Sequence, residues 1–308
     1  MFFSVVIPTY NRLPILQKCL RALEQQQLVA AISGYEVVLV DDGSTDDTVA
    51  WVQSQAEALP HVRLICQNHG GPAAGRNRGV QAARGDVIVF IDSDLVVTCG
   101  FLSAHAAALQ QAWTRQGDRR CFTYGAVINT ANFEDPTSER HKLRDASWAY
   151  FATGNVAIDR SVLEQAGLFD TAFRLYGWED LELGERLRRL GVQLIRCPQA
   201  VGYHWHPALS LEQIPRLIEV ERERARMGLV FYRKHPSRRV RLIIQYPRFP
   251  WLLWELRTLG GLLNERSLRP LLAWLIRNGQ AAWAMELLRL PLNRIGVRSL
   301  FAEARNPV

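Results

Sequence analysis

The sequence predicts an α/β fold, in which a mostly parallel sheet is flanked by helices and followed by a helical C-terminal extension. Over residues 1–91, short apolar runs alternate with amphipathic segments at regular spacing, the pattern of a doubly wound parallel sheet. Residues 87–91 are wholly apolar, which is typical of a strand buried on both faces. From about residue 210 the chain is rich in Arg, Leu and Trp and has a helical pattern. We therefore expect two domains, residues 1–208 and residues 209–308.

The elements of the first half follow from the apolar runs and from the residues that end them. Pro8 ends the first run, Gly43 permits a turn after the second, and Gly85 ends the helical segment before the fourth. We expect strands at residues 3–8, 36–40, 62–66 and 87–91, and helices at about residues 13–27, 46–57 and 73–83.

The second half is less regular, but its elements can still be assigned. Residues 129–150 are polar, so we expect a loop there. Gly191 ends a helix that begins at Glu179. The other expected elements are a helix at about 100–115, strands at 122–128 and 154–158, a short helix at 160–166, and two short strands at 192–196 and 200–205.

The composition excludes several classes of protein. The five cysteines are scattered and form no C-x-x-C pair, so neither a disulfide framework nor a zinc site is indicated, and a reducing compartment fits best. No stretch of 18 apolar residues occurs, and the N-terminus lacks the basic and small-residue parts of a signal peptide. We therefore expect a cytoplasmic protein without a transmembrane helix.

Three of the predicted strands end in polar stretches, which read I-P-T-Y-N-R, V-D-D-G-S-T-D and V-F-I-D-S-D. Ligands of parallel sheets bind beyond the carboxyl ends of the strands, so we expect these ends to gather at one edge. Two acids two residues apart can share a divalent cation, and Mg²⁺ and Mn²⁺ favour carboxylate oxygens. The residues expected at this edge are Thr9, Asp42, Asp92 and Asp94, with Arg76 from the helix after the third strand.

Other interpretations of these residues stay open. Asp-Ser-Asp is also a common sequence in turns that bind no metal. Asp42 also fits a turn that caps the next helix. No G-x-G-x-x-G and no G-K-[ST] occurs, so a sugar nucleotide fits the edge better than NAD or ATP.

The order and spacing of I-P-T-Y-N, V-D-D-G-S-T-D and D-S-D resemble those of glycosyltransferase family 2, inverting enzymes with the GT-A (Rossmann-like) fold. The resemblance covers about residues 3–206. It implies a Mn²⁺ or Mg²⁺ ion bracketed by Asp92 and Asp94, with Asp94 as the direct ligand. It also implies nucleoside contacts from Thr9 and Asp42. The nucleotide-sugar site expected from it comprises Pro8, Thr9, Asp42, Arg76, Asp92 and Ser93.

The second chemical signal is Y-G-W-E-D at residues 176–180. Family members carry an E-D pair at a helix start after a Gly- and Trp-rich loop, so the resemblance implies Asp180 as the catalytic base and Glu179 as a residue that orients acceptor or donor. In inverting transfer a base must deprotonate the acceptor hydroxyl as it attacks the anomeric carbon. The alternative is that both acids only complement the helix dipole.

Three further positions join the expected site. Asn155 resembles a family position that lines the donor-sugar pocket, with a strand-end turn as the alternative. Trp178 is expected to stack on a sugar ring, although loop aromatics also serve packing. His204 aligns, better than His206, with a histidine that is a metal ligand in some relatives, and a structural or acceptor-loop role stays open.

The C-terminal extension lies outside the resemblance and carries the positive charge of the chain. Residues 210–308 hold 18 Lys and Arg against 8 Asp and Glu, whereas the whole chain has a net charge of +7. In residues 240–308, short Trp- and Leu-rich segments alternate with arginines, a composition typical of helices that lie on a membrane surface. The alternative is a helical bundle that packs on the first domain or on a second copy. No nucleic-acid module is recognised.

Together these observations predict a metal-assisted inverting glycosyltransferase. It would move a sugar from a nucleoside-diphosphate sugar, UDP-sugar being favoured, to a glycan or lipid-linked acceptor, as in polysaccharide biosynthesis. One alternative is a catalytically silent, membrane-associated scaffold of the same fold. The other is a nucleotidyltransferase that makes the sugar nucleotide, but that class usually has a Gly-rich basic loop after the first strand, and residues 8–12 are not one.

Overall fold

The computed structural model describes residues 1–140 and 149–305. Its chain forms two compact units, which we describe separately. The first comprises Met1–Arg174 and Glu179–His206, and the second comprises Leu175–Trp178 and Pro207–Val308.

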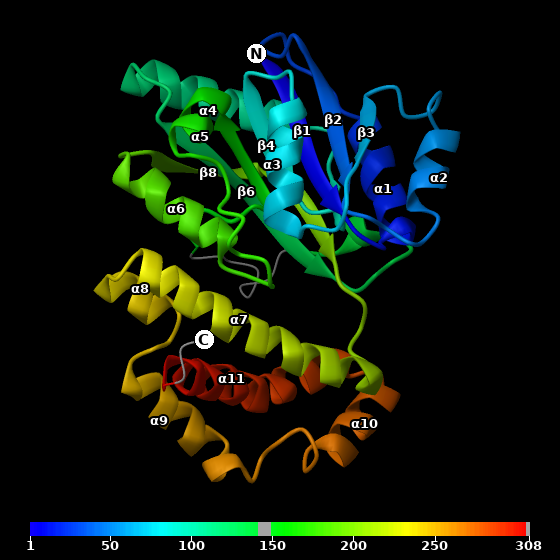
Figure 1. The fold of residues 1–308 in the computed structure, drawn as a ribbon. Coiled ribbons are helices and arrows are strands. Elements are labelled where there is room, and N and C mark those ends of the chain that lie inside the picture. The colour runs from blue at the N-terminus through cyan, green and yellow to red at the C-terminus, as the bar shows by residue number, and fades with distance from the viewer. Residues whose placement is uncertain (141–148, 306–308) are drawn as a thin grey trace. The chain divides into compact units, whose positions relative to one another are not determined.

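The first unit is built on one eight-stranded sheet (Figure 1). In sheet order the strands are β3 (Val62–Cys66), β2 (Gly34–Asp41), β1 (Phe2–Thr9), β4 (Val87–Ile91), β7 (Asn155–Asp159), β6 (Cys121–Thr130), β8 (Gln193–Trp205) and β5 (Leu95–Val97). The strands β3, β2, β1 and β4 are mutually parallel. The strand β7 is antiparallel to both of its neighbours, and β5 is antiparallel to β8. The expected α/β fold class, with a mostly parallel sheet, is confirmed.

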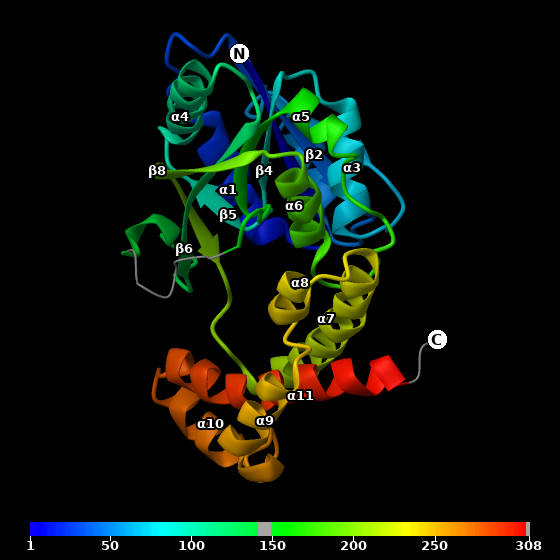
Figure 2. The same cartoon turned by 90° about the vertical axis from the view of Figure 1, so that its left-hand side faces the viewer.

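Helices cover both faces of this sheet because successive side chains of a strand point to opposite sides. Val5 faces the core that contains α1 (Leu13–Glu24), α2 (Thr48–Ser54) and α4 (Phe101–Gln116). Val6 faces the core that contains α3 (Pro72–Ala82), α5 (Arg160–Gln165) and α6 (Glu179–Arg189). Figure 2 shows α1 and α4 on one side of the sheet and α3, α5 and α6 on the other.

The structure differs from the sequence expectation around β8. Residues 192–196 and 200–205 were expected as two strands, but β8 is continuous from Gln193 to Trp205. The register of β8 against β6 shifts between Gly125 and Ala126, so β8 carries extra residues opposite this point and stays one strand. The three-residue β5 was not expected. Of the expected loop at 129–150, residues 141–148 lie outside the described residues, and a short 3-10 helix, η1 (Pro136–Ser138), lies before them.

The second unit consists of helices, as expected. They are η3 (Leu211–Gln213), α7 (Ile214–Lys234), α8 (Arg238–Ile243), α9 (Arg248–Arg257), η4 (Leu259–Gly261), α10 (Arg269–Arg277) and α11 (Ala281–Arg305). Leu272 and Leu288 are fully buried in its own apolar core. Among the described residues, no helix combines the length and the apolar character needed to cross a bilayer.

Candidate functional site

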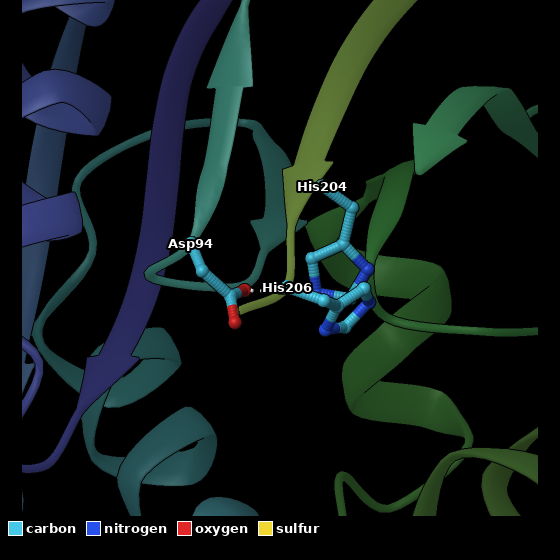
Figure 3. A group of neighbouring side chains, drawn as sticks. All are labelled: Asp94, His204 and His206. Atoms are coloured by element: carbon cyan, nitrogen blue, oxygen red, sulfur yellow. Dashed lines mark ion pairs between the residues drawn. The ribbon is translucent and has the colours of Figure 1, made fainter. Parts of the chain in front are cut away.

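The pairing of β5 with β8 assembles three possible metal ligands. Leu95 lies opposite His204 in this antiparallel pair, and the backbone N–H of Trp205 donates to the carbonyl of Asp94 at 3.0 Å. The carboxylate of Asp94 therefore faces the imidazoles of His204 and His206 at the end of β8 (Figure 3). One ligand atom from each of these three residues lies within 4.8 Å of the other two.

Charged neighbours hold Asp94 in its ionised form. Its Oδ1 lies 2.9 Å from Nε2 of His204, and its Oδ2 forms an ion pair with Arg12. Burial alone would raise the pKa of Asp94, but the hydrogen bond from His204 and the charges of His204 and Arg12 outweigh burial and keep that pKa below its ordinary value. Burial would lower the pKa of His204, but the hydrogen bond to Asp94 and the charge of Asp94 outweigh burial and raise the pKa of this imidazole.

The donor set fits a divalent cation. Desolvation by the surrounding protein and the nearby charge of His204 lower the pKa of His206 to about 4, so its imidazole is neutral at ordinary pH, the form that binds metals. One carboxylate and two imidazoles leave coordination positions open for phosphate oxygens. A carboxylate and imidazole nitrogens are both common ligands of divalent metal ions in proteins.

Arg76 connects the first acid of D-S-D with the E-D pair. Its guanidinium is buried and lies 3.0 Å from Oδ1 of Asp92 and 3.0 Å from Oε1 of Glu179. The ends of β4, α3 and α6 thereby meet at one point. Asp92 is engaged with Arg76 and does not belong to the group formed by Asp94 and the two histidines.

Asp180, which follows Glu179 in α6, has a shifted pKa. Burial and the adjacent charge of Glu179 raise the pKa of Asp180 to about 7, against the opposing charge of Arg76. A carboxylate with a pKa near neutrality can both accept and release a proton under physiological conditions. This side chain is therefore suited to general-base chemistry.

The carboxylate of Asp42 is held by the loop that follows β3. It accepts hydrogen bonds from the backbone N–H groups of Gly70 at 2.9 Å and Gly71 at 2.8 Å, and from the amide of Gln67 at 2.7 Å. The backbone N–H of Asp42 donates to the carbonyl of Thr9 at 2.9 Å. The ends of β1 and β2 thus lie side by side, with both residues buried.

Several polar atoms at this edge are left without protein partners. Among residues 1–140 and 149–305, Thr9 Oγ1, Arg76 Nε and Glu179 Oε2 are buried and have no hydrogen-bond partner. Buried polar groups are nearly always paired in native proteins, so unpaired atoms from three different elements are what a ligand site without its ligand would show. The expected residues Pro8 and Ser93 also lie at this edge, at the end of β1 and between Asp92 and Asp94.

Two of the expected site residues use their polar side-chain atoms in hydrogen bonds within the protein. Asn155 is fully buried, and its amide is used within the protein: Nδ2 donates to the carbonyls of Ala126 and Ala200, and Oδ1 pairs with His105. Trp178 belongs to the second unit, where its indole N–H donates to the carbonyl of Arg224 at 2.7 Å.

The sequence reasoning missed two site residues and left a third undecided. Arg12 directly follows the I-P-T-Y-N motif, which was the available signal for it. Asn11 accepts hydrogen bonds at its Oδ1 from the backbone N–H groups of Thr45 and Asp46, so it holds the D-D-G-S-T-D turn against β1. His206 follows His204 by two residues, and their ring centroids lie 4.1 Å apart, so this spacing was the available signal; the pairing of β5 with β8, which no local pattern indicates, brings Asp94 to both.

The sheet with its polar edge and the gathered metal-ligand group define a protein of the GT-A glycosyltransferase class. The chain belongs to glycosyltransferase family 2. The sequence description of that family, "Glycosyl transferase family 2", matches residues 4–167, more than half of the chain. A second description, "N-terminal domain of galactosyltransferase", matches residues 137–208.

Individual relatives agree with this assignment. The chain is 27% identical over 299 residues to a validoxylamine A glucosyltransferase of Streptomyces hygroscopicus subsp. jinggangensis (strain 5008), covering 85% of this chain and 66% of the relative. It spans slightly less than two thirds of the length of this relative and of the glycosyltransferase YfnE of Bacillus subtilis (strain 168).

Solved structures share the fold. The mannosyltransferase PcManGT from Pyrobaculum calidifontis, solved with GDP-Man and Mn²⁺, superposes with a TM-score of 0.60 at 20% identity, covering 98% of this chain and 86% of that one. TarS 1–349 of S. aureus, solved with UDP-GlcNAc, has a TM-score of 0.52 at 16% identity, and the match covers 99% of this chain and 92% of that one.

Proposed function

We propose that the protein is an inverting glycosyltransferase that moves a sugar from a nucleoside-diphosphate sugar to a hydroxyl group of a glycan or lipid-linked acceptor. The observation that carries this proposal is a metal-ligand group at Asp94 together with a partly buried carboxylate, Asp180, whose pKa is about 7 and whose neighbour Glu179 is joined to Asp92 through Arg76. The metal-ligand group would serve the donor diphosphate, and the carboxylate would serve the acceptor hydroxyl.

The donor diphosphate would lie at the group formed by Asp94, His204 and His206. These three residues would hold the divalent cation, which supplies positive charge for the leaving diphosphate. We propose Mn²⁺ as this cation, with Mg²⁺ as the alternative to test. The Mn²⁺ in the structure of the mannosyltransferase PcManGT is consistent with this choice.

The acceptor hydroxyl would be deprotonated by Asp180. As its oxygen forms the bond to the anomeric carbon, the bond from that carbon to the diphosphate breaks on the opposite side, and the hydroxyl proton passes to the carboxylate. Attack from the opposite face inverts the anomeric configuration, so an α-linked donor gives a β-linked product. Glu179, held by Arg76, would orient the reacting sugar through its unpaired Oε2.

For the nucleoside we propose contacts from Thr9 and Asp42 and a UDP-sugar as the donor. The unpaired hydroxyl of Thr9 is a donor and acceptor available to a base or ribose. The UDP-GlcNAc in the structure of TarS supports uridine, and the GDP-Man of PcManGT makes guanosine the alternative to test. Five free cysteines support a reducing compartment, so we propose the cytoplasm as the place of the reaction.

The test is the substitution Asp180→Asn, assayed by Mn²⁺-dependent hydrolysis of UDP-sugars, in which water replaces the acceptor. Loss of a general base should reduce turnover by roughly a hundred- to ten-thousandfold, while calorimetric binding of UDP with Mn²⁺ should change little. The matched control is Asp47→Asn, at an exposed carboxylate before α2, which should leave turnover unchanged. Full turnover in Asp180→Asn would refute the base assignment. Absence of hydrolysis in the unsubstituted chain, despite binding of UDP with Mn²⁺, would favour the silent scaffold.

A further inference from the structure

The second unit exposes many large apolar side chains. Most of the exposed large hydrophobic residues of the described chain lie between Leu242 and Trp283. Five of them form what we call the apolar ridge: Phe249 (72% exposed), Leu252 (61%), Leu256 (71%), Leu259 (59%) and Leu262 (72%). Monomeric soluble proteins rarely expose contiguous apolar surface of this kind without a use for it.

The first part of the ridge is one face of a helix. Its first three residues are spaced by three and four along α9, so they lie on the same side of that helix. Its last two residues, Leu259 and Leu262, follow α9 along the chain, at the start of η4 and just after it. Leu271 and Trp274 of α10 and Trp283 of α11 are also exposed, at 47%, 54% and 68%.

These elements share a location within the second unit. In both Figure 1 and Figure 2, α9, η4 and α10 lie on the opposite side of α11 from α7. The apolar core of the unit is filled by other residues, among them Leu268, Leu272 and Leu288. The ridge is therefore not needed for packing within the unit.

The surroundings of the ridge are positively charged. Residues 238–283 contain eight Arg and only two acids, Glu255 and Glu265, and the carboxylate of Glu255 is taken up by Arg294 and Arg298. Within the described residues, the exposed Arg266 and Arg277 have no carboxylate partner. These positive charges are therefore available to a negatively charged partner.

We propose that the apolar ridge and its flanking arginines bind the surface of a membrane that contains anionic lipids. Apolar side chains enter the boundary between head groups and acyl chains, and arginines stay at the anionic head groups. Trp274 and Trp283 fit this boundary because the indole ring is both apolar and a hydrogen-bond donor. Helices of this length lie in the interface and do not span the bilayer. A second copy of the chain fits less well, because its ridge would bring like charges together.

The experiment is flotation of the full chain with two kinds of vesicle, phosphatidylcholine alone and phosphatidylcholine mixed with phosphatidylglycerol. We expect recovery with the mixed vesicles, weaker recovery with the neutral ones, and loss of binding as the salt concentration rises. The double substitution Leu252→Ser with Leu256→Ser should weaken partitioning roughly tenfold or more. Its matched control is Leu28→Ser with Val29→Ser, at exposed apolar positions of the first unit, which should bind like the unsubstituted chain.

The charge is tested separately. Arg277→Gln removes an exposed arginine from the last turn of α10, and Arg115→Gln removes an exposed arginine from the last turn of α4. We expect the first to weaken binding to the mixed vesicles by about fivefold and the second to have no effect. Circular dichroism of each variant shows whether it is folded.

Two results would overturn the proposal. One is equal recovery of the unsubstituted chain and of Leu252→Ser with Leu256→Ser from the mixed vesicles. The other is absence of vesicle binding together with a dimer in light scattering that Leu256→Ser dissociates, which would assign the ridge to a second copy of the chain. Neither readout depends on sugar transfer, so the proposed function stands or falls independently.

Discussion

At the scale of single residues, Arg76 holds two acids of the site in a fixed relation. It is buried between Asp92 and Glu179, 3.0 Å from each. A buried guanidinium is strongly disfavoured without an anionic partner, so the two carboxylates stabilise Arg76 in this position. The sequence indicated Arg76 as a neighbour of the nucleoside, whereas its contacts across 103 residues to Glu179 depend on tertiary structure.

The acidity of Asp180 leads to a pH-dependent rate. A general base acts only when deprotonated, and its pKa is raised to about 7 by burial and by Glu179. The kcat/KM for the donor should therefore fall by about tenfold per unit as the pH drops below 7 and level off above it. The check is a pH–rate profile, with UDP–Mn²⁺ affinity measured at each pH. A rate that follows only this affinity would contradict the assignment.

We expect Arg12 to compete with a metal ion for Asp94, because its guanidinium forms an ion pair with the same carboxylate. The substitution Arg12→Gln should therefore tighten Mn²⁺ binding in the absence of nucleotide, by a few-fold for a partly exposed pair. Isothermal titration calorimetry measures the change. Arg21→Gln, an exposed position of the same helix, serves as the control, and weaker Mn²⁺ binding by Arg12→Gln would argue against competition.

At the scale of elements, β8 is the part of the fold that local patterns described least well. Its sequence contains Pro198 and reads as two short strands, yet pairing with β6 and β5 makes it continuous. Gly125 sits at the register shift, where a Cβ atom would clash with the carbonyl oxygen of Ala200 at 2.4 Å. The strands β1 to β4 follow apolar runs and were predicted, whereas β5 has three residues, too few for a period to show.

The side-chain amide of Asn155 forms hydrogen bonds that connect β8 with β6 at the register shift. Asn155→Ala would leave the carbonyls of Ala126 and Ala200 and a nitrogen of His105 without a partner. We expect a loss of about 2–4 kcal/mol in the free energy of unfolding, measured by urea denaturation. Asn132→Ala, which removes an exposed hydrogen bond to Ser138, should cost less than about 0.5 kcal/mol. Equal losses in the free energy of unfolding for the two substitutions would show that the buried hydrogen bonds of Asn155 add nothing special to stability.

At the scale of the whole molecule, the sequence predicted two differently built parts from composition alone. The acidic motifs fall in the first unit and the excess of arginine falls in the second. Composition could not assign residues 175–178 to the second unit, because that grouping depends on contacts such as the one between Trp178 and Arg224. The placing of Asp94 beside His204 and His206 likewise follows from the pairing of β5 with β8 and not from sequence spacing.

Ligand binding should raise the stability of the folded chain by mass action. UDP at about 100 times its dissociation constant, with Mn²⁺ present, adds about 2.7 kcal/mol to stability and should raise the melting temperature by about 5 °C or more. Removal of the metal with EDTA, or Asp94→Ala, should abolish the metal-dependent part of this shift. A screen with GDP, dTDP and CDP in place of UDP tests the donor base, and a larger shift with any of them would overturn the uridine preference.

The place of β5 in the sheet bears on how the protein is made. Within the described residues, β5 has β8 as its one neighbouring strand, although β5 leaves the ribosome long before β8. The four strands β1 to β4 can associate early in synthesis, whereas Asp94 must wait for His204 and His206 to emerge. A nascent chain arrested before Trp205 would therefore carry the D-S-D motif without the three-ligand group. Any metal binding that needs all three ligands would therefore have to wait until His206 has been translated.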